Sequence, residues 1–162
     1  MRNVSQKKQT DIVIREMQSA DIDRILELEK LIFPDPWPRS AFTEQLSGNG
    51  WGGFVAVNDE TVIGYLCTLI IDREAHITNI AIEPEYRRYG IASRLLEPFL
   101  TLVSSSPVEY ILLEVRASNQ EAQAFYERHG FSFLYRRKNY YRRPIEDALV
   151  LVRHIETHGS GE

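Results

Sequence analysis

The change of hydrophobic pattern near residue 83 is the feature that most constrains how this chain can fold. Before it, apolar and β-branched segments separated by turn residues are typical of a meander of strands. After it, segments of helical periodicity alternate with further strands. We expect strands over 54–57, 62–71 and 76–82, a helix over 90–104, a strand over 108–115, a helix that ends at Gly130, and strands over 131–135 and 145–155. A chain that combines both patterns in this order predicts a mixed α/β domain.

The segment that precedes the meander predicts one strand and two helices. A strand near 12–17 is followed by a helix that Ser19 can cap. The apolar residues at helical spacing are Ile22, Ile25, Leu28 and Ile32. Three prolines within the sequence FPDPWP at 33–38 must end this helix, because proline has no N–H group and clashes with the preceding turn. A short helix over 39–46 is expected next.

A length of 162 residues is that of one domain, and no repeat or low-complexity tract divides the chain. We expect a single α/β domain over 10–155, between a flexible N-terminus over 1–9 and a flexible tail over 156–162. The N-terminus lacks the apolar region of a signal peptide, and no window reaches the ~18 consecutive apolar residues of a membrane span. The lone cysteine, Cys67, cannot form an internal disulfide. These features predict a cytoplasmic protein that does not bind membranes.

The charge balance argues against general nucleic-acid binding. The chain has 19 Lys and Arg against 23 Asp and Glu, a net charge of −4, whereas a nucleic-acid-binding domain is expected to be basic. Five basic residues nevertheless lie within 136–143. They fit either a solvated loop or contact with a polyanion, which would be a phosphorylated cofactor or RNA. The histidines show no metal-ligand spacing, and we expect no metal site.

The turn from the strand 79–82 into the helix near Gly90 has the chemistry of an anion-binding site. Backbone N–H groups at a helix start point outward, and the helix dipole adds partial positive charge. Gly90 has no Cβ, so an anion can approach the backbone closely, and Ala92 keeps the next turn small. Taken alone, a single glycine at such a turn is a weak signal, because an ordinary structural turn gives the same pattern.

Three motifs taken together are far more specific. Arg87-x-x-Gly90-x-Ala92 follows a strand, LEVRASN over 113–119 ends a later strand, and AFYERHGF over 124–131 lies in the helix after it. They resemble the GNAT superfamily of acetyl-CoA-dependent N-acetyltransferases over about residues 10–155. LEVRASN, AFYERHGF and the later RRKNYY are similar to the bacterial ribosomal-protein-alanine N-acetyltransferase (RimI-like) branch. The resemblance implies a mixed, mostly antiparallel sheet flanked by helices, with central parallel strands that splay apart.

The resemblance implies that Glu114 is the general base and Tyr126 the general acid of the transfer. An α-amine has a pKa of ~7.7–8.0 and a thiol one of ~8.5, so a modest base and a weak acid suffice. Glu114 also lies at the end of a strand where α/β proteins usually bind ligands. The alternatives are a structural Glu114 paired with an arginine and a Tyr126 that only packs in the core. The less favoured candidate bases are Glu109, Glu83 and Glu74.

The same resemblance implies acetyl-CoA as the cosubstrate. The strand backbone at Ile80, Ala81 and Ile82 would bind the pantetheine, and one of its N–H groups could polarise the thioester carbonyl. Asn119 would contact the cofactor, although its place at a helix start also fits helix capping. The remaining cofactor contacts are expected at Arg87, Arg88, Tyr89, Gly90, Ile91, Ala92, Ser93 and Tyr126.

Aromatic residues in two expected loops indicate a groove for a peptide. The resemblance places both loops beside the acceptor; ordinary loop packing is the alternative. The expected groove residues are Phe33, Trp37, Tyr140 and Tyr141. The expected activity is acetylation of the N-terminal α-amine of a protein, with the N-terminal alanine of a small-subunit ribosomal protein as acceptor. The alternatives are a GNAT enzyme that acetylates a small amine or a lysine, and a catalytically silent acyl-CoA-binding module, against which the presence of both Glu114 and Tyr126 argues.

Overall fold

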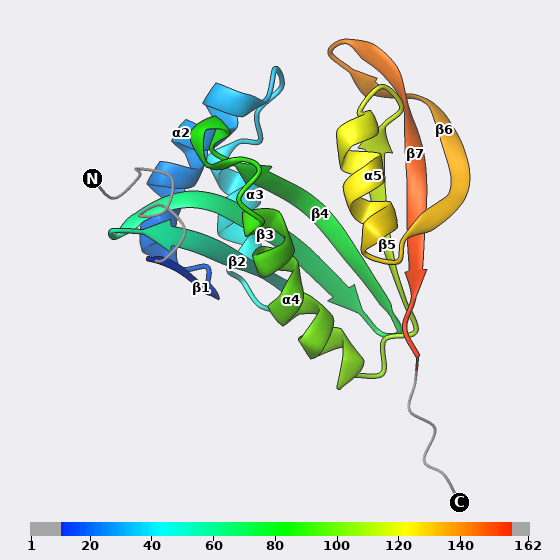
Figure 1. Ribbon diagram of the computed structural model, residues 1–162, viewed down its shortest axis with the longest axis horizontal. Coiled ribbons are helices and arrows are strands. Elements are labelled where there is room, and N and C mark those ends of the chain that lie inside the picture. Colours follow the sequence, from blue (N-terminus) through cyan, green and yellow to red (C-terminus); the bar gives the residue numbers. More distant parts are fainter. Residues whose placement is uncertain (1–10, 157–162) are drawn as a thin grey trace, which may run out of the picture. The chain divides into compact units, whose positions relative to one another are not determined.

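The computed structural model describes residues 11–156, which form a seven-stranded sheet in the order β1-β2-β3-β4-β5-β7-β6 (Figure 1). The elements in chain order are β1 (Ile12–Glu16), η1 (Ser19–Asp21), α2 (Ile22–Ile32), α3 (Arg39–Gln45), β2 (Trp51–Asn58), β3 (Thr61–Ile71), β4 (Glu74–Ile82), η2 (Pro84–Tyr86), α4 (Ile91–Ser104), β5 (Tyr110–Arg116), α5 (Gln120–Arg128), β6 (Ser132–Arg142) and β7 (Ile145–His154). The β4–β5 pair is parallel, whereas β1–β2, β2–β3, β5–β7 and β6–β7 are antiparallel. The expected mixed, mostly antiparallel sheet is confirmed. The terminal segments expected to be flexible lie outside the described residues, apart from Glu156.

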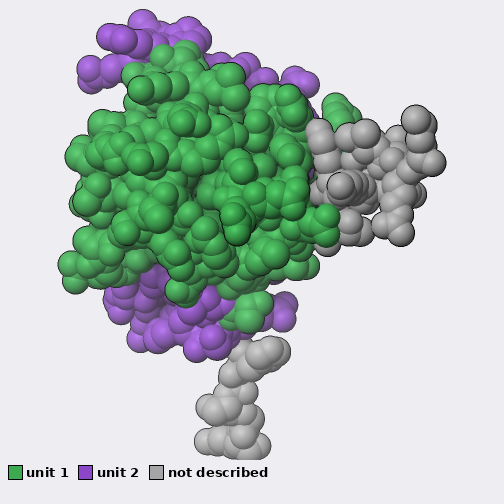
Figure 2. Space-filling model, turned by 90° about the vertical axis from the view of Figure 1, so that its left-hand side faces the viewer, with its two compact units in different colours: residues 1–69, 79–101 green, residues 70–78, 102–162 purple. Residues whose placement is uncertain are grey.

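The chain divides into two compact units, which are coloured separately in Figure 2. The first unit consists of residues 1–69 and 79–101, and the second of residues 70–78 and 102–162. Because β3, β4 and α4 contribute residues to both units, neither unit is a continuous stretch of chain. The limits of a domain over 10–155 stay a prediction.

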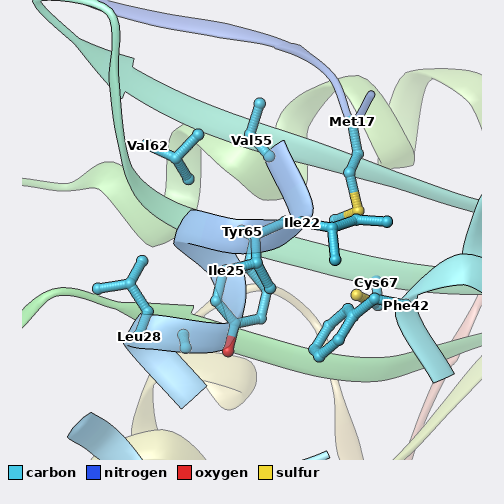
Figure 3. Packing of buried hydrophobic residues seen from close by; sticks show 10 residues of the cluster. Met17, Ile22, Ile25, Leu28, Phe42, Val55, Val62, Tyr65 and Cys67 are labelled. Carbon is cyan, nitrogen blue, oxygen red and sulfur yellow. The ribbon is translucent and has the colours of Figure 1, made fainter. Parts of the chain in front are cut away.

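The core of the first unit forms where α2 packs against the strands. Ile25 and Leu28 of α2 are fully buried, together with Phe42 of α3 and Tyr65 of β3. Figure 3 shows the Tyr65 ring among Ile25, Leu28 and Phe42. The Phe42 and Tyr65 rings meet edge to face with their centroids 5.9 Å apart, a favourable aromatic geometry. Burial of each such large side chain contributes roughly 1.5–3 kcal/mol.

The start of the first helical segment differs from the expectation that Ser19 is its cap. A single turn of 3-10 helix, η1, precedes α2, and the capping group is the carboxylate of Asp21. It accepts the N–H of Gln18 at 2.7 Å and both guanidinium nitrogens of Arg15 at 2.7 and 2.8 Å. Burial opposes ionisation of Asp21, but the bonds from Arg15 and Gln18 outweigh it and hold the pKa of this carboxyl below its usual value.

The helix α4 begins at Ile91, directly after Gly90. Ile91 and Phe99 are buried as expected, whereas Leu102, which was expected on the same face, is 49% exposed. Pro98 lies inside the helix and has no N–H group to bind the carbonyl of the preceding turn. None of the described helices is long and apolar enough to cross a membrane.

In the second unit, β5 alternates between buried and half-buried residues. Ile111, Leu113 and Val115 are buried, while Glu114 and Arg116 are half-buried on the opposite face. The expectation that both faces of this strand are covered is therefore wrong. One face is open enough to leave a carboxylate accessible to solvent.

The strand β6 is much longer than expected. It was expected to end at Tyr135 but extends to Arg142, so that the basic RRKNYY segment lies in an edge strand rather than in a loop. Its pairing with β7 shifts register between Arg137 and Tyr141, where Asn139 has a positive φ of 51°. Asp147 of β7 accepts the N–H of Asn139 at 2.9 Å and an Arg136 nitrogen at 2.9 Å. These two bonds allow the strand to continue through the irregularity.

Candidate active site

The turn between β4 and α4 in the first unit contains two residues with left-handed backbone. Arg88 has φ of 69° and Gly90 has φ of 73°, both in the left-handed region. A Cβ built at Gly90 meets nothing within 4 Å, so the space beside this residue is open. Residues that alternate between left- and right-handed backbone turn their N–H groups to one side and form concavities that bind anions. Binding of an anion by the turn over 87–93, the expected cradle, stays a prediction.

The strand that leads into this turn is held by backbone and charged contacts. Gly64 of β3 permits close approach, because a Cβ there would lie 2.7 Å from Cδ1 of Ile82 and 3.1 Å from the carbonyl oxygen of Ala81. The N–H of Glu83 donates to the carbonyl of Ile63 at 2.7 Å. Arg87 donates from Nε to the carbonyl of Ile82 at 3.1 Å. Ala81 is buried, and its neighbours in the strand are half-buried.

Glu114 lies on β5 in the second unit within a group of arginine and tyrosine side chains. Its Oε1 is 3.4 Å from Nη1 of Arg137, and its side chain is 27% exposed. Arg137 lies over the Tyr140 ring, with Cζ 4.5 Å from the ring centroid, and Arg116 lies over the Tyr141 ring at 4.1 Å. The alternative that Glu114 is paired with an arginine is thus observed. The pairing leaves the carboxylate half-open and does not bury it.

The two tyrosines beside Glu114 are kept protonated. Burial, with the added negative charge of Glu114, raises the pKa of Tyr140 above its ordinary value. Burial also raises the pKa of Tyr141 to about 12, and Tyr140 and Glu114 add to this effect. Both hydroxyl groups can therefore donate hydrogen bonds near neutral pH. They lie in β6, which corrects their expected position in a loop.

Tyr126 lies on α5 in the second unit and is 4% exposed. Its ring packs edge to face against Phe125 at 5.2 Å and Phe131 at 5.4 Å between centroids. Burial raises the pKa of the Tyr126 hydroxyl well above its usual value, with a smaller contribution from Tyr141. The hydroxyl therefore keeps its proton near neutral pH. The alternative of core packing is observed, and it is compatible with a role as proton donor.

Asn119 is the N-cap of α5. Its Oδ1 accepts the N–H of Ala122 at 3.1 Å, which confirms the helix-capping alternative. Ser118 does not take part in the cap and donates instead to Glu146 at 2.9 Å. Contact between Asn119 and a cofactor stays a prediction.

Phe33 and Trp37 belong to the first unit, in the segment between α2 and α3. Both are half-buried and pack against the core of that unit. The Trp37 ring lies 5.6 Å from Phe42 between centroids. Tyr140 and Tyr141 belong to the second unit. Two of the four expected acceptor residues thus belong to each unit, and a shared groove stays a prediction.

The other candidate bases are engaged elsewhere. Glu109 forms an ion pair with Arg73 at 2.9 Å, Glu83 with Arg24 at 3.1 Å, and Glu74 lies 3.3 Å from His76. No group of three or more His, Cys, Asp or Glu side chains is arranged to hold a metal ion within residues 11–156.

Arg116 and Arg137 were not expected to be members of the group around Glu114. For Arg116 a signal existed, because residues two apart on a strand face the same side. For Arg137 there was none, because its place opposite Ala148 depends on the shifted register between β6 and β7.

Comparison with known proteins defines the family. A sequence model described as the acetyltransferase (GNAT) family matches residues 22–131, about two thirds of the chain. The chain belongs to the GNAT acetyltransferase family. The match spans the turn at Gly90 as well as Glu114, Asn119 and Tyr126, but it ends before β6.

Three relatives extend the similarity of this GNAT chain to nearly its whole length. A Bacillus subtilis protein, provisionally named [ribosomal protein bS18]-alanine N-acetyltransferase, is 35% identical over 88% of this chain and 95% of its own. An N-alpha-acetyltransferase of Saccharolobus solfataricus is 34% identical over 94% of this chain and 99% of its own. The crystal structure of the ribosomal-protein-S18-alanine N-acetyltransferase from Escherichia coli has a TM-score of 0.85 and 29% identity, covering 93% of this chain and 98% of that one.

Proposed function

We propose that this acetyltransferase moves the acetyl group of acetyl-CoA to the N-terminal α-amine of a protein, and that the acceptor is the N-terminal alanine of a small-subunit ribosomal protein. The observation that carries the proposal is the arrangement in the second unit. This unit contains a half-buried carboxylate, Glu114, and tyrosines whose hydroxyl groups stay protonated. Such a site supplies one modest base and several hydroxyl donors. Relatives named for this acceptor cover nearly the whole chain and support the choice.

In the proposed reaction the neutral α-amine attacks the thioester carbonyl. A C–N bond forms, the C–S bond breaks, and coenzyme A leaves as a thiolate. Glu114 takes the proton that the amine loses, either directly or through water. Because an α-amine has a pKa of ~7.7–8.0, an appreciable fraction of it is already neutral near pH 7, and a single carboxylate suffices as the base.

Tyr126 donates to the leaving sulfur in this proposal. Its raised pKa makes it a weak acid, so its first contribution is a hydrogen bond to the developing thiolate rather than early release of its proton. The backbone of 80–82 and the turn over 87–93 bind the cofactor. Asn119 adds a contact there while it caps α5. The aromatic residues Phe33, Trp37, Tyr140 and Tyr141 contact the acceptor.

The turn at Gly90 can be tested with a matched control. Gly48 also has a positive φ, 80°, and open space around its missing Cβ. Gly90→Ala and Gly48→Ala should therefore lose similar stability in thermal unfolding. Only Gly90→Ala should raise the KM for acetyl-CoA, by about 10-fold or more if a phosphate hydrogen bond is lost. An equal KM in the two variants would contradict the cradle.

The base can be tested with Glu114→Gln. We expect kcat on an N-terminal alanine peptide to fall by the ~10²–10⁴ typical of a lost general base. The loss should become smaller between pH 7 and pH 9, where the amine is already neutral. Glu109→Gln is the control, because Glu109 is an exposed ion-pair partner of Arg73 in the same unit. A Glu114→Gln enzyme with full activity at pH 7 would remove Glu114 from this role.

The acid can be tested with Tyr126→Phe, which removes one hydroxyl and keeps the ring between Phe125 and Phe131. Turnover should fall while the calorimetric affinity for acetyl-CoA stays close to that of the wild type. Tyr135→Phe is the control, since this residue is 48% exposed on β6. Normal turnover of Tyr126→Phe would mean that water protonates the thiolate.

The acceptor class is decided by comparing kcat/KM for three substrates at one pH. They are a peptide with a free N-terminal alanine, the same peptide with a blocked N-terminus and an internal lysine, and spermidine. The free peptide should be preferred, because a lysine amine costs about 2.5 further pKa units to deprotonate. Preference for spermidine or the blocked peptide would leave only the broader acetyltransferase assignment. Acetyl-CoA binding with no turnover on any amine would indicate a silent binding module.

A further inference from the structure

A second carboxylate, outside the group around Glu114, is fully buried in the first unit. Glu29 lies on α2 and is 1% exposed. Its carboxylate accepts three hydrogen bonds: one from the hydroxyl of Tyr65, one from Nδ2 of Asn79 at 2.6 Å, and one from the N–H of Trp37 at 2.8 Å. A buried charge is tolerated only when its lone pairs are satisfied in this way. Nothing in the proposed reaction uses this group.

The segment 33–38 depends on Glu29 because it has few groups with which to anchor itself. Pro34, Pro36 and Pro38 have no N–H, so the donors left in its backbone are those of Phe33, Asp35 and Trp37. The N–H of Phe33 donates to the backbone carbonyl of Glu29 at 2.9 Å. The N–H of Trp37 donates to Oε2 of the same residue. One residue therefore holds the segment at both ends.

The other carboxylate oxygen of Glu29 connects this segment to the sheet. Oε1 accepts from Tyr65 on β3 and from Asn79, the residue before the strand backbone 80–82. Burial, strengthened by the charge of Glu29, raises the pKa of Tyr65 far above its usual value, so its hydroxyl stays a donor. The Tyr65 hydroxyl oxygen is drawn in red in Figure 3.

We propose that Glu29 is a positioning residue that fixes the segment 33–38 against β3 and β4 and so presents Phe33 and Trp37 to the acceptor. The acceptor part of this inference rests on the proposed function. The anchoring part does not, because it concerns only contacts within the first unit.

Anchoring is tested by fluorescence. The chain has two tryptophans, so Trp51→Phe leaves Trp37 as the single reporter. In this background Glu29→Met should increase acrylamide quenching of Trp37, because the segment loses its bond at Trp37. Tyr65→Phe removes a donor to Oε1 but leaves the Trp37 bond, and its quenching should match the background protein. Glu27→Gln, an exposed neighbour on α2 that contacts only Arg24 in the described ion pairs, is a surface control.

The effect on the acceptor is tested by kinetics. Glu29→Met should raise the KM for the N-terminal alanine peptide by about 10-fold, the range of a lost charged hydrogen bond. The affinity for acetyl-CoA and the kcat at saturating peptide should change little. Glu29→Gln should restore most of the peptide affinity, because its amide oxygen can accept from Trp37 while Tyr65 and Asn79 rotate to accept from its nitrogen.

Two results would overturn the proposal. One is that Glu29→Met leaves the quenching of Trp37 and the KM for the peptide unchanged. The other is that Tyr65→Phe raises the quenching and the KM as much as Glu29→Met does, because Glu29 would then contribute only to the general stability of the first unit. If Glu29→Met does not fold, Glu29→Asp retracts the carboxylate by one methylene and should change both readouts in the same direction. If the wild type acetylates no peptide, the proposed function fails, and quenching alone still decides the anchoring.

Discussion

The short parallel pairing of β4 with β5 is the constraint on which the second unit depends. Three residue pairs are involved, from Glu74–Tyr110 to His76–Leu112. Parallel strands need a long crossover, and the turn after β4 together with α4 provides it. Beyond Leu112, the strand neighbour of β5 is β7, which pairs with it as far as Arg116. Glu114 thus lies where β5 has left its parallel partner, on the half-buried face that it shares with Tyr110, Leu112 and Arg116.

The charged side chains of this protein act through contacts with their immediate neighbours, and the net charge of −4 does not describe these contacts. Arg116 and Arg137 lie over tyrosine rings, and Arg136 pairs with Asp147. Contact with an aromatic face holds a guanidinium in place while it remains charged, and Arg137 lies in this way 3.4 Å from the Glu114 carboxylate. The basic segment of β6 therefore contributes Arg137 to the surroundings of Glu114.

The periodicity of the hydrophobic residues predicted much of the fold, but it did not predict the register between strands that pair over a long stretch of sequence. The pattern around Ile22 and Leu28 predicted α2, and apolar, β-branched segments between turn residues predicted the central strands. The extension of β6 could not be foreseen, because it depends on bonds from Asp147 to a distant segment. Glu114 and Tyr126 were proposed from their motifs, whereas the contact of Arg137 with Glu114 was not expected. Glu29 left a signal that was missed, since it lies seven residues from Ile22, on the apolar side of α2.

The contacts of Glu29 also define what can be exchanged between related proteins. The segment 33–38 takes its shape from a residue that precedes it by one helical turn, and that residue is bound to two strands. If the segment alone were moved into a related protein, a buried charge in that protein could lose its partner. Otherwise the proline-rich segment would lack its anchor. The transferable module is the second half of α2 together with the segment and matching residues at positions 65 and 79. Recombination within such a scaffold would have to respect that boundary.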